Sequence, residues 1–279
     1  MDRPSYLLDI PADEYHAATK ANVYTTSHRL QLFRRCPALY KKTIDGEIVE
    51  GDTAAFALGR ATHTYIIEGA DAFNAANLVS DGPTNEKTGK PYGRLTKAYA
   101  EWAAEQSKPV IGTEDAALIE KMSAAVHAHP VATDLLSAGF AEGTIRTEWD
   151  GEPVQARMDW FDTERKILLD LKTCADVDRF EWDIRDYGYV AQLAFYAHLV
   201  ELAGGPKLIS LKAYLVAVEK KEPFRVAVYF VSPSTLENAH LLHMGNEFWR
   251  NDNTAMMEEL KQCRATGVWP TRFEKQIII

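Results

Sequence analysis

The sequence predicts a single mixed α/β domain in which helices flank a central sheet. Two observations carry this prediction: apolar residues follow a helical period at both ends of the chain, and they alternate as in strands from about residue 142. Helices, then strands, then helices again are typical of one α/β domain. We expect one domain over 1–279, with a helical part at 1–140, a sheet core at 141–231 and C-terminal helices at 232–279.

The first 140 residues are predicted to be mainly helical. Apolar residues recur there at three- and four-residue spacings, and Thr26 and Asp52 can cap the helices that follow them. Pro37 and His129-Pro130 should interrupt helices. The segment 81–94 combines Gly, Pro and charged residues and is predicted to be a loop. The expected helices cover about 27–33, 52–67, 95–107 and 114–127.

The remainder of the chain alternates between strand and helix signals. Asp150-Gly151 is a strong signal for a two-residue hairpin turn between two alternating segments. Gly204-Gly205 should end a long helix. The expected strands are 142–149, 153–161, 166–172, 208–218 and 224–231, and the expected helices cover about 178–203, 232–249 and 252–265.

Composition and charge exclude several classes of protein. The chain of 279 residues is 46% hydrophobic and 25% charged, as in ordinary globular proteins rather than disordered or fibrous ones. It has no apolar run long enough to span a membrane and no secretory signal at its start, so we expect a cytoplasmic protein. The net charge of −9 argues against coating of nucleic acid by bulk attraction. This charge does not exclude an enzyme that acts on nucleic acid and binds it along a local strip of basic residues.

The densest chemical signal is formed by Asp159, Asp170 and Lys172. Asp170 and Lys172 are two residues apart on a predicted strand, so their side chains should point to one face. Asp159 lies on the preceding strand, across a short connection. Two carboxylates beside one ammonium suit a Mg²⁺-dependent phosphodiester hydrolase, because the carboxylates hold a hard cation and the ammonium neutralises the transition state.

An acid-x-Lys triplet is weak evidence by itself. The triplets at 164–166, 219–221 and 259–261 are best interpreted as solvated surface pairs. The triplet at 170–172 differs because it ends an apolar strand, where charge is costly unless it is paired or lies at a cleft. From the residues alone, a structural ion pair and a catalytic role remain equally open.

Five segments in order along the chain point to a known family. They are Ser27–Phe33 followed by Cys36-Pro37 and Tyr40; Gly59–His63; Arg157-Met158-Asp159; Asp170-Leu171-Lys172-Thr173; and Tyr187-Gly188-Tyr189 followed by Gln192 and Phe195-Tyr196. With these motifs the chain resembles the PD-(D/E)XK nucleases of the RecB type, most closely the phage exonuclease VIII (RecE) group. The resemblance implies a PD-(D/E)XK, restriction-endonuclease-like core with a central mixed sheet flanked by helices.

The resemblance assigns roles to residues of these motifs. It implies that Asp159, Asp170, His63 and the backbone carbonyl of Leu171 bind the metal, that Lys172 is catalytic, and that Gln192 lies beside the active site. A histidine on a helix is more often a packing residue, and it is the place of His63 in the motif series that favours a ligand.

The resemblance also suggests an acidic residue on the first strand and several DNA contacts. Glu142 matches the acidic position, although Glu148 shares its face and a solvent-exposed strand residue is the alternative. Tyr196 lies one helical turn after Gln192 and shares its face of the helix, which favours a place at the site. Packing in the core is almost as good an explanation for this residue. Lys87 and Lys90 could follow a DNA backbone, or simply belong to a solvated loop. The expected DNA-binding residues are Arg60, Arg157, Tyr196, Lys87 and Lys90.

By this resemblance, we expect an exonuclease that uses Mg²⁺, or Mn²⁺ in its place, on linear double-stranded DNA. It would degrade one strand from 5′ to 3′ and leave 3′ tails for recombination, with a RecT-like single-strand annealing protein as partner. The resemblance also implies a homo-oligomeric ring, expected to be a tetramer. Because the chain has no long apolar run, we expect no membrane association.

Two alternatives remain open. One is a RecB-like nuclease of the CRISPR-adaptation or helicase–nuclease type, many of which hold an iron–sulfur cluster; Cys36, Cys174 and Cys263 are too few for a four-cysteine cluster, so we expect none. The other is a nuclease fold that only binds DNA.

We expect Trp160, Trp182, Trp249 and Trp269 to lie in the core, because they do not cluster in the sequence.

Overall fold

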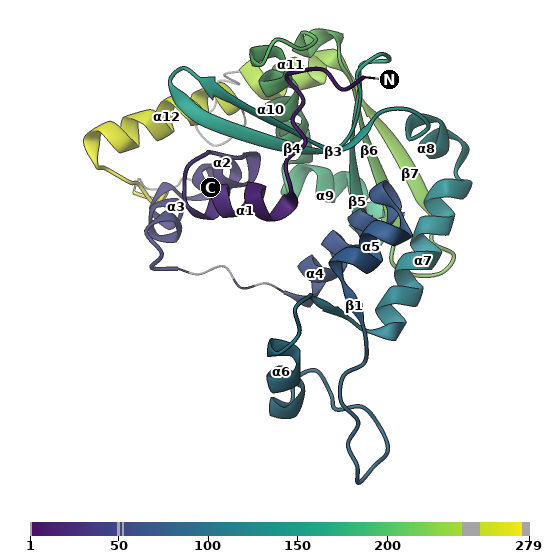
Figure 1. The fold of residues 1–279 in the computed structure, drawn as a ribbon. Helices are drawn as coiled ribbons and strands as arrows, with labels where there is room; N and C mark the ends of the chain where they lie inside the picture. The colour runs from purple at the N-terminus through teal and green to yellow at the C-terminus, as the bar shows by residue number, and fades with distance from the viewer. Residues whose placement is uncertain (1, 49–50, 52, 242–251, 275–279) are drawn as a thin grey trace.

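A five-stranded mixed sheet lies at the centre of the computed structural model, which describes residues 2–48, 51, 53–241 and 252–274 (Figure 1). The strand order is β3-β4-β5-β6-β7, and only β5 and β6 are parallel to each other. This confirms the predicted fold class. The strands are β3 (Phe140–Trp149), β4 (Glu152–Asp162), β5 (Ile167–Cys174), β6 (Lys212–Glu219) and β7 (Val226–Val231).

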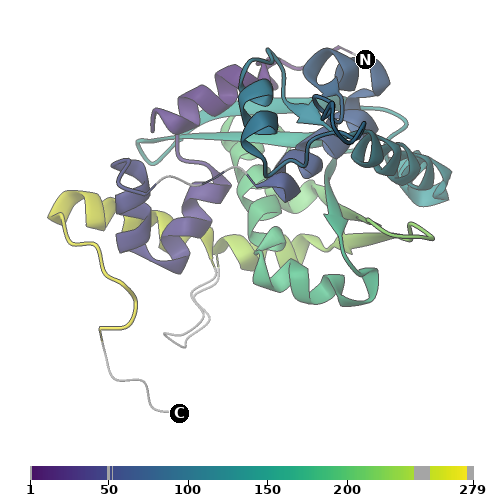
Figure 2. The same ribbon diagram turned by 90° about the horizontal axis from the view of Figure 1, so that it is seen from below.

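Helices cover both faces of this sheet (Figures 1 and 2). Alternate residues of β5 belong to different cores: Leu168 packs with one set of helices, and Leu169 and Leu171 pack with the other. The first core includes α2 (Ser27–Arg35), α3 (Pro37–Ile44), α9 (Phe180–Asp186), α10 (Tyr189–Leu202), α11 (Pro233–Leu241) and α12 (Asn253–Thr266). The second includes α4 (Ala54–His63), the π-helical turn Thr64–Glu68, α5 (Ala70–Ala76), α7 (Thr113–Ala128) and α8 (Pro130–Leu135).

The hairpin between β3 and β4 forms as predicted. Trp149 pairs with Glu152, so the loop holds only Asp150 and Gly151. Both loop residues have positive φ, 47° for Asp150 and 82° for Gly151, as a type I′ turn requires.

Several predicted boundaries are wrong. The helix expected at about 178–203 is broken at Gly188, which adopts a left-handed conformation with φ 66° between α9 and α10. Residues 208–210 form a 3₁₀ turn rather than the start of a strand. The helix expected at 232–249 is described only as far as Leu241. Elements that the sequence did not predict are α1 (Ala12–Lys20), α3, α5, α8 and the short strands β1 (Leu78–Val79) and β2 (Val110–Ile111).

The segment 81–94 is a loop, as predicted, and it precedes α6 (Lys97–Ala104). In Figure 1 this region extends from the lower end of the molecule, away from the central sheet. Within the described residues, no helix is both long enough and apolar enough to cross a membrane.

Glu219, at the end of β6, is not part of the solvated surface pair that the sequence suggested for 219–221. It forms a charged network that should stabilise the sheet. Its carboxylate is fully buried, accepts hydrogen bonds from Arg225 at 2.7 and 2.9 Å, and accepts another from the Val177 backbone N–H at 2.9 Å. The hydrogen bonds from Arg225 lower the pKa of Glu219 to about 2, although burial opposes this shift. The ionised carboxylate therefore stabilises the fold above pH 4.5, its ordinary pKa, and this contribution is lost as the pH falls towards 2.

We expect Glu219→Gln to lower the free energy of unfolding by about 1–3 kcal/mol at pH 7, because a hydrogen bond to a charged group is lost. Urea unfolding of both proteins at pH 7 and pH 3 measures this, and the difference should shrink at pH 3. Equal midpoints at pH 7 would contradict the role assigned to this network.

Candidate active site

The candidate site lies where β4 and β5 separate. Their pairing ends at Trp160 and Leu169, whereas β5 stays paired with β6 as far as Cys174. The Asp159 carboxylate fills the gap, since its Oδ2 accepts a hydrogen bond of 2.7 Å from the backbone N–H of Leu171. The N–H and C=O of one strand residue point to the same edge. The Leu171 carbonyl, a predicted metal ligand, therefore faces the same gap.

Asp170 and Lys172 lie side by side on the face of β5 that α10 covers. The Lys172 Nζ is 2.5 Å from Asp170 Oδ2, and Gln192 of α10 donates a hydrogen bond of 3.3 Å to Asp170 Oδ1. The same Gln192 amide nitrogen lies 2.7 Å from the hydroxyl of Tyr196, which is buried. The sequence-predicted residues Asp170, Lys172 and Gln192 are thus in direct contact, and Tyr196 contacts Gln192 from the core.

His63 reaches the same gap from the opposite face of the sheet. It is the last residue of α4, directly before the π-helical turn Thr64–Glu68. Its Nδ1 is 3.3 Å from Asp159 Oδ2. Single π-helical turns are frequent at functional sites. The structure therefore brings His63 and Asp159 together from two distant parts of the chain.

Glu142 is the acidic residue of β3 that lies beside this cluster. The pairs Ala141–Trp160 and Gly143–Met158 flank it, so the register places Glu142 opposite Asp159. Glu142 has a positive φ of 51°, and its carboxylate accepts a hydrogen bond of 2.6 Å from Arg157. Glu148 is exposed and sits near the hairpin, opposite Pro153. Of the two candidates, Glu142 is the one next to Asp159.

Burial and mutual charge shift the pKa values of this cluster in opposite directions. Burial raises the pKa of Asp170 to about 6 and that of Glu142 to about 7. Burial acts the same way on Asp159, but His63 overcomes it and lowers the pKa of that carboxyl. Conversely, burial disfavours the charged form of His63, yet Asp159 raises the pKa of the imidazole. Such divergent pKa values in one cluster are typical of functional sites.

The donor set of this cluster fits a hard divalent cation. Two carboxylates, a carbonyl and one imidazole are ligands that suit Mg²⁺ or Mn²⁺. Asp170 Oδ2 is buried and, despite its closeness to the Lys172 ammonium, takes part in no well-aligned hydrogen bond within the described part of the chain. In the described ranges, no three His, Cys, Asp or Glu side chains are already grouped to hold an ion. Binding would therefore require some side-chain adjustment.

The predicted DNA-binding residues are not all at the gap. Arg157 is largely buried, bound to Glu142 and to the backbone carbonyl of Ile10. Arg60 is exposed on α4, one turn before His63. Lys87 and Lys90 are exposed in the loop at 81–94. Their contacts with DNA remain predictions.

One expectation about the tryptophans is wrong, and one aromatic residue at the site was missed. Trp182 on α9 is 59% exposed rather than part of the core. Trp160 and Trp269 do pack against the two cores, and Trp249 lies outside the described residues. Tyr189, a motif residue to which no role was assigned, has its ring 4.8 Å from the Lys172 ammonium. Its position next to a motif glycine was the available signal.

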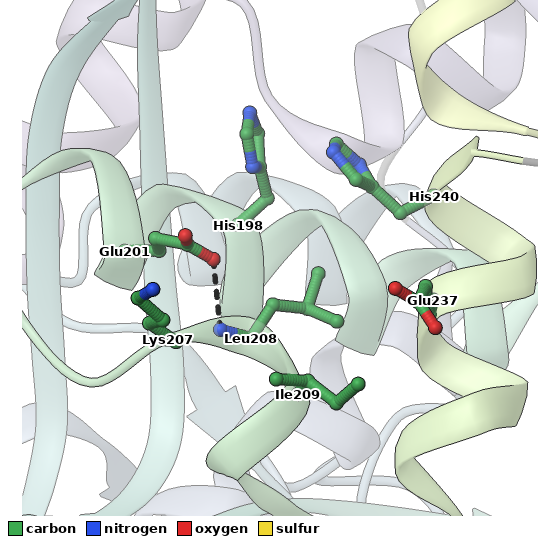
Figure 3. Close-up of a pocket in the computed structure, with 7 residues that line it drawn as sticks. All are labelled: His198, Glu201, Lys207, Leu208, Ile209, Glu237 and His240. Carbon is green, nitrogen blue, oxygen red and sulfur yellow. Dashed lines mark hydrogen bonds between the residues drawn. The ribbon is translucent and has the colours of Figure 1, made fainter.

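A cavity of about 250 Å³ lies elsewhere, between α10 and α11 (Figure 3). It is lined by His198, Glu201, Lys207, Leu208, Ile209, Glu237 and His240. The two imidazole rings are 3.9 Å apart, and burial lowers the pKa of both to about 4. They are therefore neutral at pH 7 and pack as core residues against Trp149. The cavity shares no residue with the cluster around Asp170.

Comparison with known proteins identifies the family. Residues 27–277 match the model of the PDDEXK-like domain of unknown function (DUF3799). The chain belongs to this family. The Asp159, Asp170 and Lys172 cluster therefore sits in a PDDEXK-like domain, as the motif order predicted.

One solved structure is similar in fold over nearly the whole chain. A "putative exonuclease" from Eubacterium rectale is similar over 98% of this chain and 95% of its own, with a TM-score of 0.67 and 16% identity. A phage-related exonuclease from Haemophilus somnus 129PT is similar over 75% of this chain and 95% of its own, with 14% identity and a TM-score of only 0.33. No curated protein matches the sequence.

Proposed function

We propose that the protein is a Mg²⁺-dependent exodeoxyribonuclease. It hydrolyses phosphodiester bonds of linear double-stranded DNA from 5′ to 3′ and leaves 3′ tails for recombination. One observation carries the proposal: in a PDDEXK-like domain, the buried Asp170 carboxylate, the partly buried Asp159 carboxylate and an ammonium meet where β4 and β5 separate.

Asp159, Asp170, the Leu171 carbonyl and His63 are the groups that would hold the cation. When bound, a divalent cation supplies an activated water and neutralises charge on the phosphate and the leaving oxygen. Mn²⁺ should replace Mg²⁺, since both accept oxygen ligands with one imidazole.

The other residues hold this set in place and act on the phosphate. Lys172, 2.5 Å from Asp170, would place its ammonium against the developing negative charge of the transition state. Gln192 fixes the Asp170 carboxylate through its second oxygen, and Arg157 fixes Glu142 beside Asp159. Glu142 has a raised pKa of about 7, which suits proton transfer near neutral pH.

Linear and covalently closed circular duplexes of the same sequence, each incubated with Mg²⁺, test the exonuclease proposal. We expect the linear DNA to be degraded and the circle to stay intact. Cleavage of the circle would show an endonuclease. Stable binding without cleavage of either DNA would favour a fold that only binds DNA.

We further propose a closed ring of four subunits that works with a RecT-like single-strand annealing protein. With a net charge of −9, a monomer would be attracted only weakly to DNA and should dissociate after few cuts. Enclosing the duplex solves this problem, and cyclic symmetry would repeat one interface around the ring. The segment 276–279 is apolar and is expected to pack either on a neighbouring subunit or on the chain's own core; it lies outside the described residues.

Light scattering at micromolar concentration should give about four times the subunit mass of 31.3 kDa. In parallel, digestion of long duplex in the presence of an excess of unlabelled competitor should continue on DNA already bound. A monomeric mass together with distributive digestion would contradict the ring.

A further inference from the structure

An exposed tyrosine, Tyr187, is linked to the Lys172 ammonium through a second, partly buried ring, that of Tyr189. The ammonium is 4.8 Å from the centre of the Tyr189 ring, and the Tyr189 ring is 5.7 Å from that of Tyr187. Tyr187 is 59% exposed, whereas the side chain of Lys172 is only 16% exposed. Tyr187, Tyr189 and Lys172 thus form a row of neighbouring side chains that runs from the solvent to the candidate active site.

This row is held firmly by its surroundings. Phe180, which is 1% exposed, stacks on the inner ring, Tyr189, at 5.9 Å with an interplanar angle of 30°. Tyr187 itself precedes Gly188, whose left-handed conformation joins α9 to α10. The Gln31 side chain donates a hydrogen bond of 3.2 Å to the Gly188 carbonyl and ties this turn to α2. The exposed ring is therefore presented by an anchored turn.

The exposed ring of Tyr187 suits an uncharged, planar ligand. The charges that α9 exposes beside it are mixed and do not select a phosphate, since Glu181 and Asp186 are carboxylates and Arg185 is a cation held over the Trp182 ring. A nucleobase has no charge, and stacking on an aromatic side chain accepts any base. We propose that Tyr187 forms a base-stacking subsite for an unpaired nucleobase of the strand that is being cut.

The subsite would hold the nucleotide next to the scissile phosphate. Two contacts, of 4.8 and 5.7 Å, separate Tyr187 from the ammonium that faces that phosphate. A stacked base at this distance would keep the end of the strand apart from its complement and in line with Lys172. This inference rests on the proposed nuclease function and adds to it the part of the DNA that α9 contacts.

Three variants separate stacking from simple loss of a side chain. Tyr187→Phe keeps the ring, Tyr187→Leu keeps apolar volume without a ring to stack, and Phe230→Ala removes an aromatic ring of similar exposure, 54%, from β7. We expect Tyr187→Leu to raise KM for linear duplex about 5- to 150-fold, as expected for the loss of one stacked base. Tyr187→Phe and Phe230→Ala should stay within twofold of the wild type.

A second readout detects the stacked base directly. Linear duplexes with 2-aminopurine at successive positions from the 5′ end are bound in Ca²⁺, and their fluorescence is compared between wild type and variants. We expect quenching at one or two positions with wild type and Tyr187→Phe, and its loss with Tyr187→Leu. Unchanged KM and unchanged fluorescence in Tyr187→Leu, with a wild type that cuts DNA, would overturn this subsite alone. A wild type that neither cuts nor binds duplex would overturn the proposed function as well.

Discussion

Replacing Asp170 with Asn, or Lys172 with Ala, should lower the rate of DNA hydrolysis by about 10²–10⁴-fold. Asp170→Asn removes the negative charge that would hold the cation but keeps the shape of the side chain. Lys172→Ala removes the ammonium that would face the transition state. Initial rates on end-labelled linear duplex under single-turnover conditions measure both effects.

The fold should survive these changes. Burial raises the pKa of Asp170 to about 6, so keeping this carboxylate ionised in the folded protein costs free energy. A neutral Asn at this position avoids that cost. Thermal unfolding should therefore show no lower midpoint for Asp170→Asn. The matched control is Lys221→Ala, which alters a second acid-x-Lys triplet whose lysine is exposed. Normal activity in folded Asp170→Asn or Lys172→Ala would remove this cluster from catalysis.

Removal of divalent cations should abolish hydrolysis, and Mg²⁺ or Mn²⁺ should restore it. The reason is that Asp159, Asp170 and the Leu171 carbonyl offer oxygen ligands, and His63 adds one imidazole. Ca²⁺ should support DNA binding without turnover, because it accepts loose, high-coordination geometry and activates water poorly. Digestion in EDTA, followed by titration with each cation, gives the comparison.

Full activity in EDTA would contradict the metal-dependent mechanism. The purified protein is also expected to contain no stoichiometric iron, since three cysteines do not complete a four-cysteine cluster. An iron–sulfur absorbance would instead favour the RecB-like nucleases of the CRISPR-adaptation or helicase–nuclease type.

The sequence predicts those parts of the fold that depend on local pattern. Alternating apolar and polar residues on both sides of Asp150-Gly151 identified the two strands of the β3–β4 hairpin. Asp-Gly identified the turn between them, because both turn residues must adopt positive φ. The break at Gly188 was missed because apolar residues continue through it. Short helices such as α5 and α8 offer too few turns for their period to stand out.

The sequence predicts which residues meet in the candidate site better than it predicts how they are arranged. The spacing of Asp170 and Lys172 placed both on one face of a strand, and the structure agrees. The gap between β4 and β5, the bond from Leu171 to Asp159 and the approach of His63 depend on strand register and helix packing. These are long-range contacts that no local pattern encodes. The exposure of Trp182 was missed for the same reason.

Digestion of a linear duplex labelled on either the 5′ or the 3′ end of one strand, with wild type and Lys172→Ala side by side in Mg²⁺, shows from which end the DNA is degraded and whether the lysine is required. We expect the wild type to release the 5′ label early in short products while the 3′ label stays in long fragments, and Lys172→Ala to release neither. Release of both labels at equal rates by the two proteins, or of neither label by the wild type, would contradict an exonuclease site built on Asp159, Asp170 and Lys172.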